Sequence, residues 1–273
     1  MSSYPPRRCG IGAYAAAQVR ALREAGDEVT VLSPLDGDGD VRASFVGGGA
    51  FLRAAAMGSR FDRIVVHFQP ALYFAPRRPV SKVLTAAALL ALAAARGPTL
   101  EILVHEADPP SLIRPDYLMI RTAFQLAGRV SFHTEAERAS FERDYRLTGG
   151  LRRRRGIRSQ VVPHLSASTG AVPARAEARR LLGVAEDPGP VLVCVGFIQP
   201  SKGLDRALEA FARVFRSGDE AGGSASALRG SLYLVGSVRE DTVENRLYAL
   251  SAAGQGAVLR PVWPMLPLST PER

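Results

Sequence analysis

Short apolar runs alternate with stretches of helical period along the whole chain. In the first block the apolar runs predict strands at 28–34, 63–68, 100–106, 129–133 and 159–164. Between them, apolar residues recur at helical spacing and predict helices at 13–25, 80–96, 116–127 and 134–145. Thr134 is the predicted N-cap of the last helix. Regular alternation of strand and helix indicates an α/β fold with parallel sheets covered by helices.

A second block repeats this pattern after a change in composition. It predicts strands at 191–196, 231–236 and 257–262 and helices at 203–215 and 240–253. Before it, small residues and proline surround a short basic helix, whereas the earlier glycine-rich stretches 36–40 and 46–50 indicate flexible loops. The predicted organisation is an N-terminal Rossmann-like domain at 1–165, a linker with a short helix at 166–190 and a partial C-terminal domain at 191–273.

Composition favours a soluble protein of the cytoplasm. The chain has 273 residues, of which 47% are hydrophobic and 22% are charged, so it can bury a substantial core. Two cysteines are too few for a disulfide framework, and no signal-peptide pattern is visible. The uncharged part of helix 80–96 is shorter than the ~20 residues that span a bilayer, and it predicts a buried, alanine-rich helix.

The net charge of +9 comes almost entirely from arginine, because lysine occurs only at Lys82 and Lys202. The densest basic cluster, at 151–158, has neither interleaved aromatic residues nor a helix-turn-helix pattern. We therefore predict no nucleic-acid partner. A solvated loop and a patch facing the inner surface of a membrane both fit the cluster, so peripheral membrane association stays open.

Two glycine-containing loops are candidates for phosphate binding. Gly10 and Gly12 stand directly before the first helix, where backbone amides can approach a phosphate closely. In the second block, Gly196 ends a strand and Lys202 precedes Gly203 at the start of a helix. The first loop also fits a tight turn, and Lys202 also fits a solvated surface lysine. Neither loop is GxGxxG, so a dinucleotide is not predicted.

All four histidines of the chain lie at the ends of predicted strands. His105 belongs to a polar His-Glu pair after a buried strand, at the sheet edge where open α/β folds bind ligands, although a structural histidine fits equally well. The other three, His67, His133 and His164, are structural candidates or candidates for an acceptor site. Their spacing matches no metal-binding motif, so no metal is predicted.

Three segments together resemble a known family. They are YPPRRCGIGAY at 4–14, VGFIQPSKGLDRALEAF at 195–211 and LYLVG at 232–236. As a set they resemble the retaining nucleotide-sugar glycosyltransferases of the GT-B fold, the family-4 (glycosyl transferases group 1) type. The resemblance implies two Rossmann-like domains, with a glycan, lipid or small-molecule acceptor on the N-terminal one and a nucleotide-sugar, UDP- or GDP-linked, on the C-terminal one. It implies no metal and no cofactor.

The resemblance also implies roles for individual residues. Gly10 matches the glycine whose amide meets the donor diphosphate, and Lys202 matches the lysine that neutralises this diphosphate as it leaves. Gly12 belongs to the same donor-binding loop as Gly10, and Gly196 and Gly203 belong to the loop of Lys202. His105 matches the histidine that lies near the transferred sugar. Negative charge grows on the leaving nucleotide, so such a cation stabilises the transition state more than the ground state.

The chain departs from the family pattern in three places. Phe197 stands where many relatives have an arginine, a Glu-x7-Glu signature is not found beyond 257–262, and no apolar strand precedes Tyr4. We therefore expect a homologue shortened at both ends, in which transferase activity stays open. The alternative is a non-catalytic remnant or partner of an intact glycosyltransferase. A nucleotide-sugar epimerase or other Rossmann enzyme is disfavoured, because neither GxGxxG nor a Tyr-x3-Lys pair is present.

Overall fold

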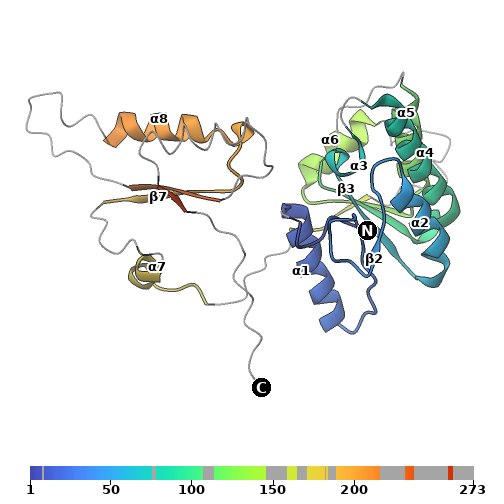
Figure 1. Ribbon diagram of the computed structural model, residues 1–273, viewed down its shortest axis with the longest axis horizontal. Coiled ribbons are helices and arrows are strands. Elements are labelled where there is room, and N and C mark those ends of the chain that lie inside the picture. Colours follow the sequence, from blue (N-terminus) through green and yellow to red (C-terminus); the bar gives the residue numbers. More distant parts are fainter. Residues whose placement is uncertain are drawn as a thin grey trace, which may run out of the picture. The chain divides into compact units, whose positions relative to one another are not determined.

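The computed structural model describes residues 1–7, 9–75, 78–106, 114–145, 159–164, 171–181, 183, 189–215, 231–236 and 258–260. The chain divides into two compact units, Met1–Thr169 and Gly170–Arg273 (Figure 1). Each described strand pairing is parallel, and strands alternate with helices as in Rossmann-like folds. The predicted α/β class with parallel sheets is therefore confirmed.

The first unit contains most of the described elements. Its helices are α1 (Gly10–Glu24), α2 (Gly49–Met57), α3 (Pro70–Tyr73), α4 (Pro79–Arg96), α5 (Pro115–Leu126) and α6 (Glu135–Asp144), with 3-10 turns η1 (Gly58–Arg60) and η2 (Gly97–Thr99). Its strands are β1 (Leu32–Ser33), β2 (Val41–Arg42), β3 (Ile64–Phe68), β4 (Leu100–Val104), β5 (Arg129–Phe132) and β6 (Ser159–Val161). They form a two-stranded sheet, β1-β2, and a four-stranded sheet in the order β3-β4-β5-β6.

The glycine-rich stretch predicted to be a flexible loop instead leads into a helix. Gly48 has φ of +84°, and a Cβ atom there would overlap the side chain of Ala88 in α4. This turn lets α2 begin at Gly49 and bury Phe51 completely. Residues 46–48 form a turn, as predicted, whereas the helix that begins at Gly49 was not predicted; the glycine at 48 permits close packing of α2 against α4.

Residues 1–3 lie along the gap between β1 and β3. The amino group of Met1 donates to the carbonyl oxygen of Val65, and the amide of His67 donates to the carbonyl oxygen of Met1, 3.0 Å away. On the other side, the amide of Ser2 donates to the carbonyl oxygen of Leu32 at 3.1 Å. These bonds give backbone partners to Leu32, Val65 and His67 on the facing sides of β1 and β3.

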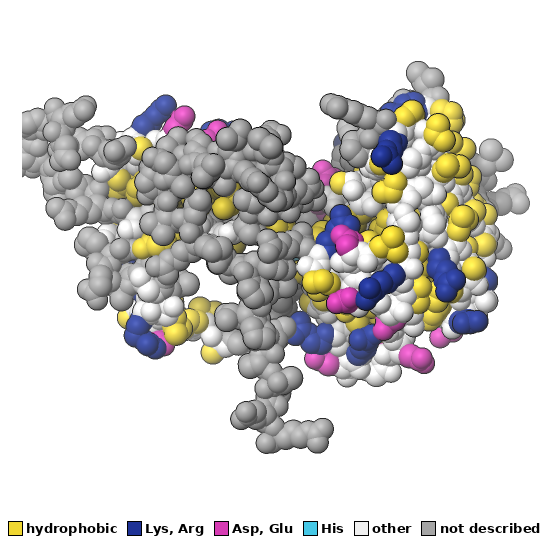
Figure 2. All heavy atoms as spheres, in the orientation of Figure 1, with side chains coloured by type: hydrophobic (Ala, Val, Ile, Leu, Met, Phe, Trp, Pro, Cys, Tyr) yellow, Lys and Arg dark blue, Asp and Glu magenta, His cyan; other side chains and the backbone are white. Residues whose placement is uncertain are grey.

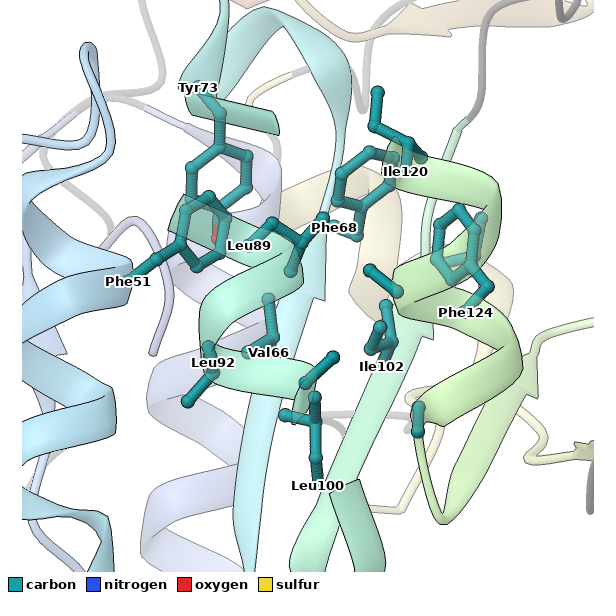
Figure 3. Packing of buried hydrophobic residues seen from close by; sticks show 14 of the residues in the cluster. Phe51, Val66, Phe68, Tyr73, Leu89, Leu92, Leu100, Ile102, Ile120 and Phe124 are labelled. Atoms are coloured by element: carbon teal, nitrogen blue, oxygen red, sulfur yellow. The ribbon is translucent and has the colours of Figure 1, made fainter. Parts of the chain in front are cut away.

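The core lies on one face of the four-stranded sheet. Val66, Phe68 and Ile102 point from this face toward α2, α4 and α5, as Figure 3 shows. Leu89 of α4 and Phe124 of α5 fill the space above them and are fully buried. The alanine-rich helix is thus a core helix, as predicted.

Length and composition would also allow the segment Pro79–Thr99 to cross a membrane. Thr85, Ala86, Leu89 and Leu92 are buried in the core of the unit. The outer side of the same helix exposes Leu84. Among the described residues, α4 therefore buries one side in the core and exposes the other.

The opposite face of the sheet carries the polar side chains of these strands, together with Leu103, and has α1 against it, whereas α2 and α4 lie on the core side (Figure 1). At its centre the carboxylate of Glu101, in β4, is buried. It accepts hydrogen bonds from Nε of Arg63 at 2.9 Å and from Oγ of Ser131 at 2.5 Å. A buried carboxylate needs such partners, because burial removes the water that would otherwise solvate its charge.

Helix α6 begins where the sequence predicts. Thr134 is its N-cap, and the amide of Glu137 donates to the Thr134 hydroxyl oxygen at 3.2 Å. In return the amide of Thr134 donates to the Glu137 carboxylate at 3.0 Å. This reciprocal pair, a capping box, satisfies two backbone donors that the helix itself leaves open.

The second unit contains α7 (Arg175–Leu181), η3 (Pro200–Lys202) and α8 (Leu204–Phe215). Its strands β7 (Val191–Val195), β8 (Ser231–Val235) and β9 (Val258–Arg260) form one sheet in the order β7-β8-β9. Ile198, Leu204, Leu208 and Leu234 form its buried cluster. The predicted helix 240–253, the basic cluster 151–158 and the segment after 260 lie outside the described residues.

Charged side chains are spread over the surface of the first unit. On the face drawn in Figure 2, Lys and Arg side chains are scattered and have acidic side chains among them. Arg42 and Asp38, for example, form an ion pair of 2.7 Å. This face of the first unit carries no continuous basic patch.

A pair of leucine variants in α4 tests which side of the helix is buried. Leu89→Ala should lower the free energy of unfolding by about 2–5 kcal/mol, because it leaves a cavity in the core. Leu84→Ala, on the side that is 54% exposed, should change it by no more than ~0.5 kcal/mol. Urea unfolding followed by circular dichroism measures both. Equal losses would contradict the packing of this helix.

Candidate active site at the carboxyl edge of the first sheet

Four consecutive strands of the first sheet carry a histidine at or just after their carboxyl ends. His67 lies in β3, His105 and His133 directly follow β4 and β5, and His164 follows β6. Because β3 to β6 are parallel, their carboxyl ends lie at one edge of the sheet. The alternation of side chains turns His67 away from its core neighbours Val66 and Phe68. The four histidines of the chain therefore gather at one place.

Three of these rings form a hydrogen-bonded chain. Nδ1 of His67 lies 2.9 Å from Nε2 of His105, and Nδ1 of His105 lies 3.3 Å from Nε2 of His133. The chain ends on one side at the carbonyl oxygen of Val162, 3.1 Å from Nδ1 of His133. On the other side, Nε2 of His67 lies 2.9 Å from the side-chain amide of Gln18. Both ring nitrogens of His105 are thus engaged with other histidines.

Helix α1 covers this cluster with two residues one turn apart, Tyr14 and Gln18. The ring of Tyr14 stands edge-on to all four imidazoles, at centroid distances of 4.6 to 5.8 Å. Its hydroxyl group is buried and has no hydrogen-bond partner among the described residues. Burial, and then the negative charge of Glu101, raise the pKa of Tyr14. The Tyr14 phenol therefore stays protonated at neutral pH.

Burial also keeps the inner histidines neutral. It lowers the pKa of His67 well below its usual range, with smaller contributions from the amino group of Met1 and from His105 and His133. The pKa of His105 falls to about 4, first through burial and then through the nearby His133 and His164. At neutral pH these two rings therefore carry no net charge.

A neutral imidazole both donates and accepts a hydrogen bond, which suits hydroxyl groups better than it suits phosphates. Within the part of the chain that the structure describes, no group of three or more His, Cys, Asp or Glu residues is placed to hold a metal ion. The nitrogens of His105 point to two different neighbours rather than to a shared centre. The inner part of the edge thus consists of two polar rings, His67 and His105, that carry no charge at neutral pH.

The two glycines at the start of α1 occupy different surroundings. Gly10 is the first residue of the helix and is exposed, and a Cβ atom there would meet nothing within 4 Å. Gly12 is buried, and a Cβ atom there would lie 3.3 Å from both Oγ of Ser3 and the amide nitrogen of Tyr4. Gly12 therefore has a packing role, whereas no contact among the described residues requires glycine at position 10.

The second unit places its three predicted residues around one loop. Gly196 follows β7 with φ of +148°, and its amide donates to the carbonyl oxygen of Val235 at 3.0 Å. Lys202 is exposed at the end of η3, and Gly203, with φ of +61°, connects it to α8. The buried side chain of Ile198 anchors the loop in the core of this unit. Lys202 therefore lies two residues before Leu204, the first residue of α8.

The structure thus brings His105, Gly10 and Gly12 into one unit and Gly196, Lys202 and Gly203 into the other. Sequence reasoning selected His105 alone and left the other three histidines apart. Their positions at the ends of four successive strands contained the signal that they meet. Tyr14 and Gln18 were not recognised as parts of the site, although their spacing of four residues puts them on one face of a helix.

Comparison with known protein families and with curated proteins found no match for this chain.

The buried histidines make a prediction for acid stability. In the folded chain the pKa of His105 is about 4 against an ordinary value of 6.5, so unfolding takes up a proton between these values. The contribution of His105 to the free energy of unfolding should therefore be complete above pH 6.5 and be lost as the pH drops toward 4, by at most ~1.4 kcal/mol per pH unit. Burial lowers the pKa of the Met1 amino group from 8.0 to about 5, so this group also lowers the free energy of unfolding as the pH falls, between pH 8 and 5.

Urea unfolding at a series of pH values measures this dependence. Carboxylates also titrate in acid, so the informative quantity is the difference between variants. His105→Gln should reduce the slope between pH 6 and 4 relative to the wild type, because it removes the group whose pKa is lowered to about 4. Equal slopes in the wild type and in His105→Gln would contradict burial of a neutral His105.

Proposed function

We propose that the chain is a GT-B-type glycosyltransferase homologue. In this proposal it transfers a sugar from a UDP- or GDP-linked donor to a glycan, lipid or small-molecule acceptor with retention of configuration. The observation that carries the proposal is the loop between β7 and α8, which holds an exposed Lys202 directly before the start of a helix. A cation next to free helix amides is a setting in which proteins bind a diphosphate.

The proposed role of each unit follows from the charge of its candidate site residues. Lys202 would oppose the negative charge that grows on the leaving nucleoside diphosphate, which lowers the barrier to transfer. The exposed Gly10 leaves its amide at the start of α1 open to a phosphate group, since Cys9 provides no side-chain cap there and no acidic residue lies in the first turn. The neutral edge around His105 would bind the hydroxyl groups of the transferred sugar by exchanging one of the contacts within the histidine chain.

A lipid acceptor or an inner-membrane location has one supporting feature. The exposed start of α4 carries Val80 and Leu84 beside Arg78 and Lys82. Apolar side chains flanked by cations suit an anionic membrane surface. A cytoplasmic reaction is part of the proposal, and this end of α4 would be available for peripheral contact with the inner face of a membrane.

The second candidate is a non-catalytic nucleotide-sugar-binding partner of an intact glycosyltransferase. It is favoured by the engagement of both His105 ring nitrogens within the histidine chain. Calorimetric titration with UDP and GDP, followed by incubation with their sugar conjugates, separates the two. Binding without turnover would support the partner, binding with turnover would support the transferase, and no binding to either nucleotide would contradict both.

The two lysines of the chain offer a matched test of donor binding. Lys202→Ala should raise the Kd for the bound nucleotide at least about tenfold, which corresponds to ~1.4 kcal/mol for a lost charge-assisted contact. Lys82→Ala removes the same charge from α4 in the other unit and should leave the Kd unchanged. Calorimetry measures both. Equal effects of the two variants would remove Lys202 from the donor site.

Replacing His105 should affect transfer more than donor binding. His105→Ala removes a neutral hydrogen-bonding group from the proposed sugar site, so we expect kcat to fall about tenfold or more while the nucleotide Kd changes less than about threefold. Steady-state kinetics and calorimetry give the two quantities. A parallel loss of nucleotide affinity and rate, together with a lower melting temperature, would instead identify a structural histidine.

A further inference from the structure

The histidine chain has a fixed requirement for protons. It contains four contacts in a row, from Gln18 to His67, from His67 to His105, from His105 to His133, and from His133 to the carbonyl oxygen of Val162. Each contact needs one hydrogen between its two heavy atoms. Three neutral imidazoles carry one ring proton each, so they supply only three of the four.

The carbonyl oxygen of Val162 determines how these protons are arranged. A carbonyl can only accept, so Nδ1 of His133 must donate and its Nε2 must accept. Nδ1 of His105 must then donate to His133, and Nδ1 of His67 must donate to His105. In the neutral chain all three rings therefore carry their proton on Nδ1. The unprotonated Nε2 of His67 then needs a donor from Gln18.

A 180° rotation of the Gln18 side-chain amide lets it pair with His67 in either charge state of the three rings. With its NH2 group toward His67 it donates the fourth hydrogen, and the three rings stay neutral. With Oε1 toward His67 it accepts, and His67 must carry hydrogens on both nitrogens; the 2.9 Å between the two side chains suits either orientation. The chain then holds one additional proton and one positive charge, and no other contact has to break.

We propose that Gln18, His67, His105 and His133 form a one-proton store in which the orientation of the Gln18 amide switches with the charge of the rings. Uptake forms a single N–H bond, and the proton can pass from ring to ring because each nitrogen faces the next. Gln18 is a positioning residue: the carbonyl oxygen of Val162 sets the tautomers, and Gln18, through its contact with His67, sets the pH at which the edge becomes cationic.

Several charged or titratable groups face this chain. The amino group of Met1 lies on the neighbouring segment and, like His164, opposes a positive charge on the rings. Glu101, in β4, favours such a charge, although its carboxylate already has Arg63 and Ser131 as partners. Tyr14, on α1, contacts all four rings and stays neutral. Burial is the largest effect and favours the neutral chain.

What the stored proton is used for depends on the proposed function. In a transfer reaction the acceptor hydroxyl loses its proton as the glycosidic bond forms, and a neutral chain at this edge is able to receive it. The existence of the store does not depend on any transfer activity. It can therefore be tested on the free chain.

The first experiment uses the full wild-type chain without nucleotide, labelled with 15N histidine. Long-range 1H-15N spectra distinguish Nδ1–H from Nε2–H rings. At pH 7.5 we expect His67, His105 and His133 all to carry the proton on Nδ1, and on acidification we expect their signals to move together in one transition. An Nε2–H ring at any of the three positions, or three independent transitions, would overturn the proposal.

Three variants in α1 then test the role of Gln18. Gln18→Glu places an acceptor at His67 that cannot donate when ionised, so the shared transition should move up by about one to three pH units. Gln18→Met can neither donate nor accept and should not raise it, while the three tautomers stay as they are. Ala21→Glu adds the same charge at an exposed position of α1 and should leave the transition in place.

Equal shifts in Gln18→Glu and Ala21→Glu would overturn the switching role of the amide. If Gln18→Glu does not fold, the wild-type tautomers and the Gln18→Met titration still decide the question. Failure of nucleotide binding or transfer would count against the proposed function alone. A mixture of tautomers in the wild type would count against the proton store alone.

Discussion

The parallel pairing of β3, β4, β5 and β6 is the constraint on which the candidate site depends. Each of these strands ends in or is followed by a histidine, and only parallel pairing brings those ends to one edge. The register matters as much as the direction. A shift of one residue in β3 would turn His67 into the core and expose Val66 on the polar face. The core packing that fixes the register therefore also fixes the histidine chain.

Helix α1 completes what the sheet begins. Rings that lose their water on burial need hydrogen-bond partners from the protein, and Gln18 provides the one that the sheet cannot. α1 can lie this close to the sheet because Gly12 has no side chain where it meets Ser3 and Tyr4. Gly12 and Gln18, six residues apart in α1, thus contribute to the same cluster: one allows close packing and the other provides a hydrogen-bond partner.

The long periodic segments were predictable from the sequence, and the short irregular ones were not. The helix and strand around α4 and β4 lie within a few residues of their predicted positions, because apolar periodicity extends over many residues there. Helix α2 was missed because Gly48 and Gly49 resemble a flexible loop, and only contact with Ala88 shows why glycine is needed. His105 was selected from a resemblance and from its place after a buried strand. The contact between His67 and Gln18, which links His105 to α1, depends on how α1 packs against the sheet, and no local sequence pattern shows that.

The protonation of the site limits which chemistry each unit can perform in the proposed reaction. Burial keeps His67 and His105 neutral at physiological pH, so this edge provides no fixed positive charge against a diphosphate. It can still exchange hydrogen bonds with sugar hydroxyls, for which neutral rings are well suited. The compensating charge must then come from another residue, and an exposed lysine before a helix start, Lys202, meets that need without loss of hydration in the free protein. Separate sites for hydroxyl recognition and for charge neutralisation follow from the different burial of these side chains.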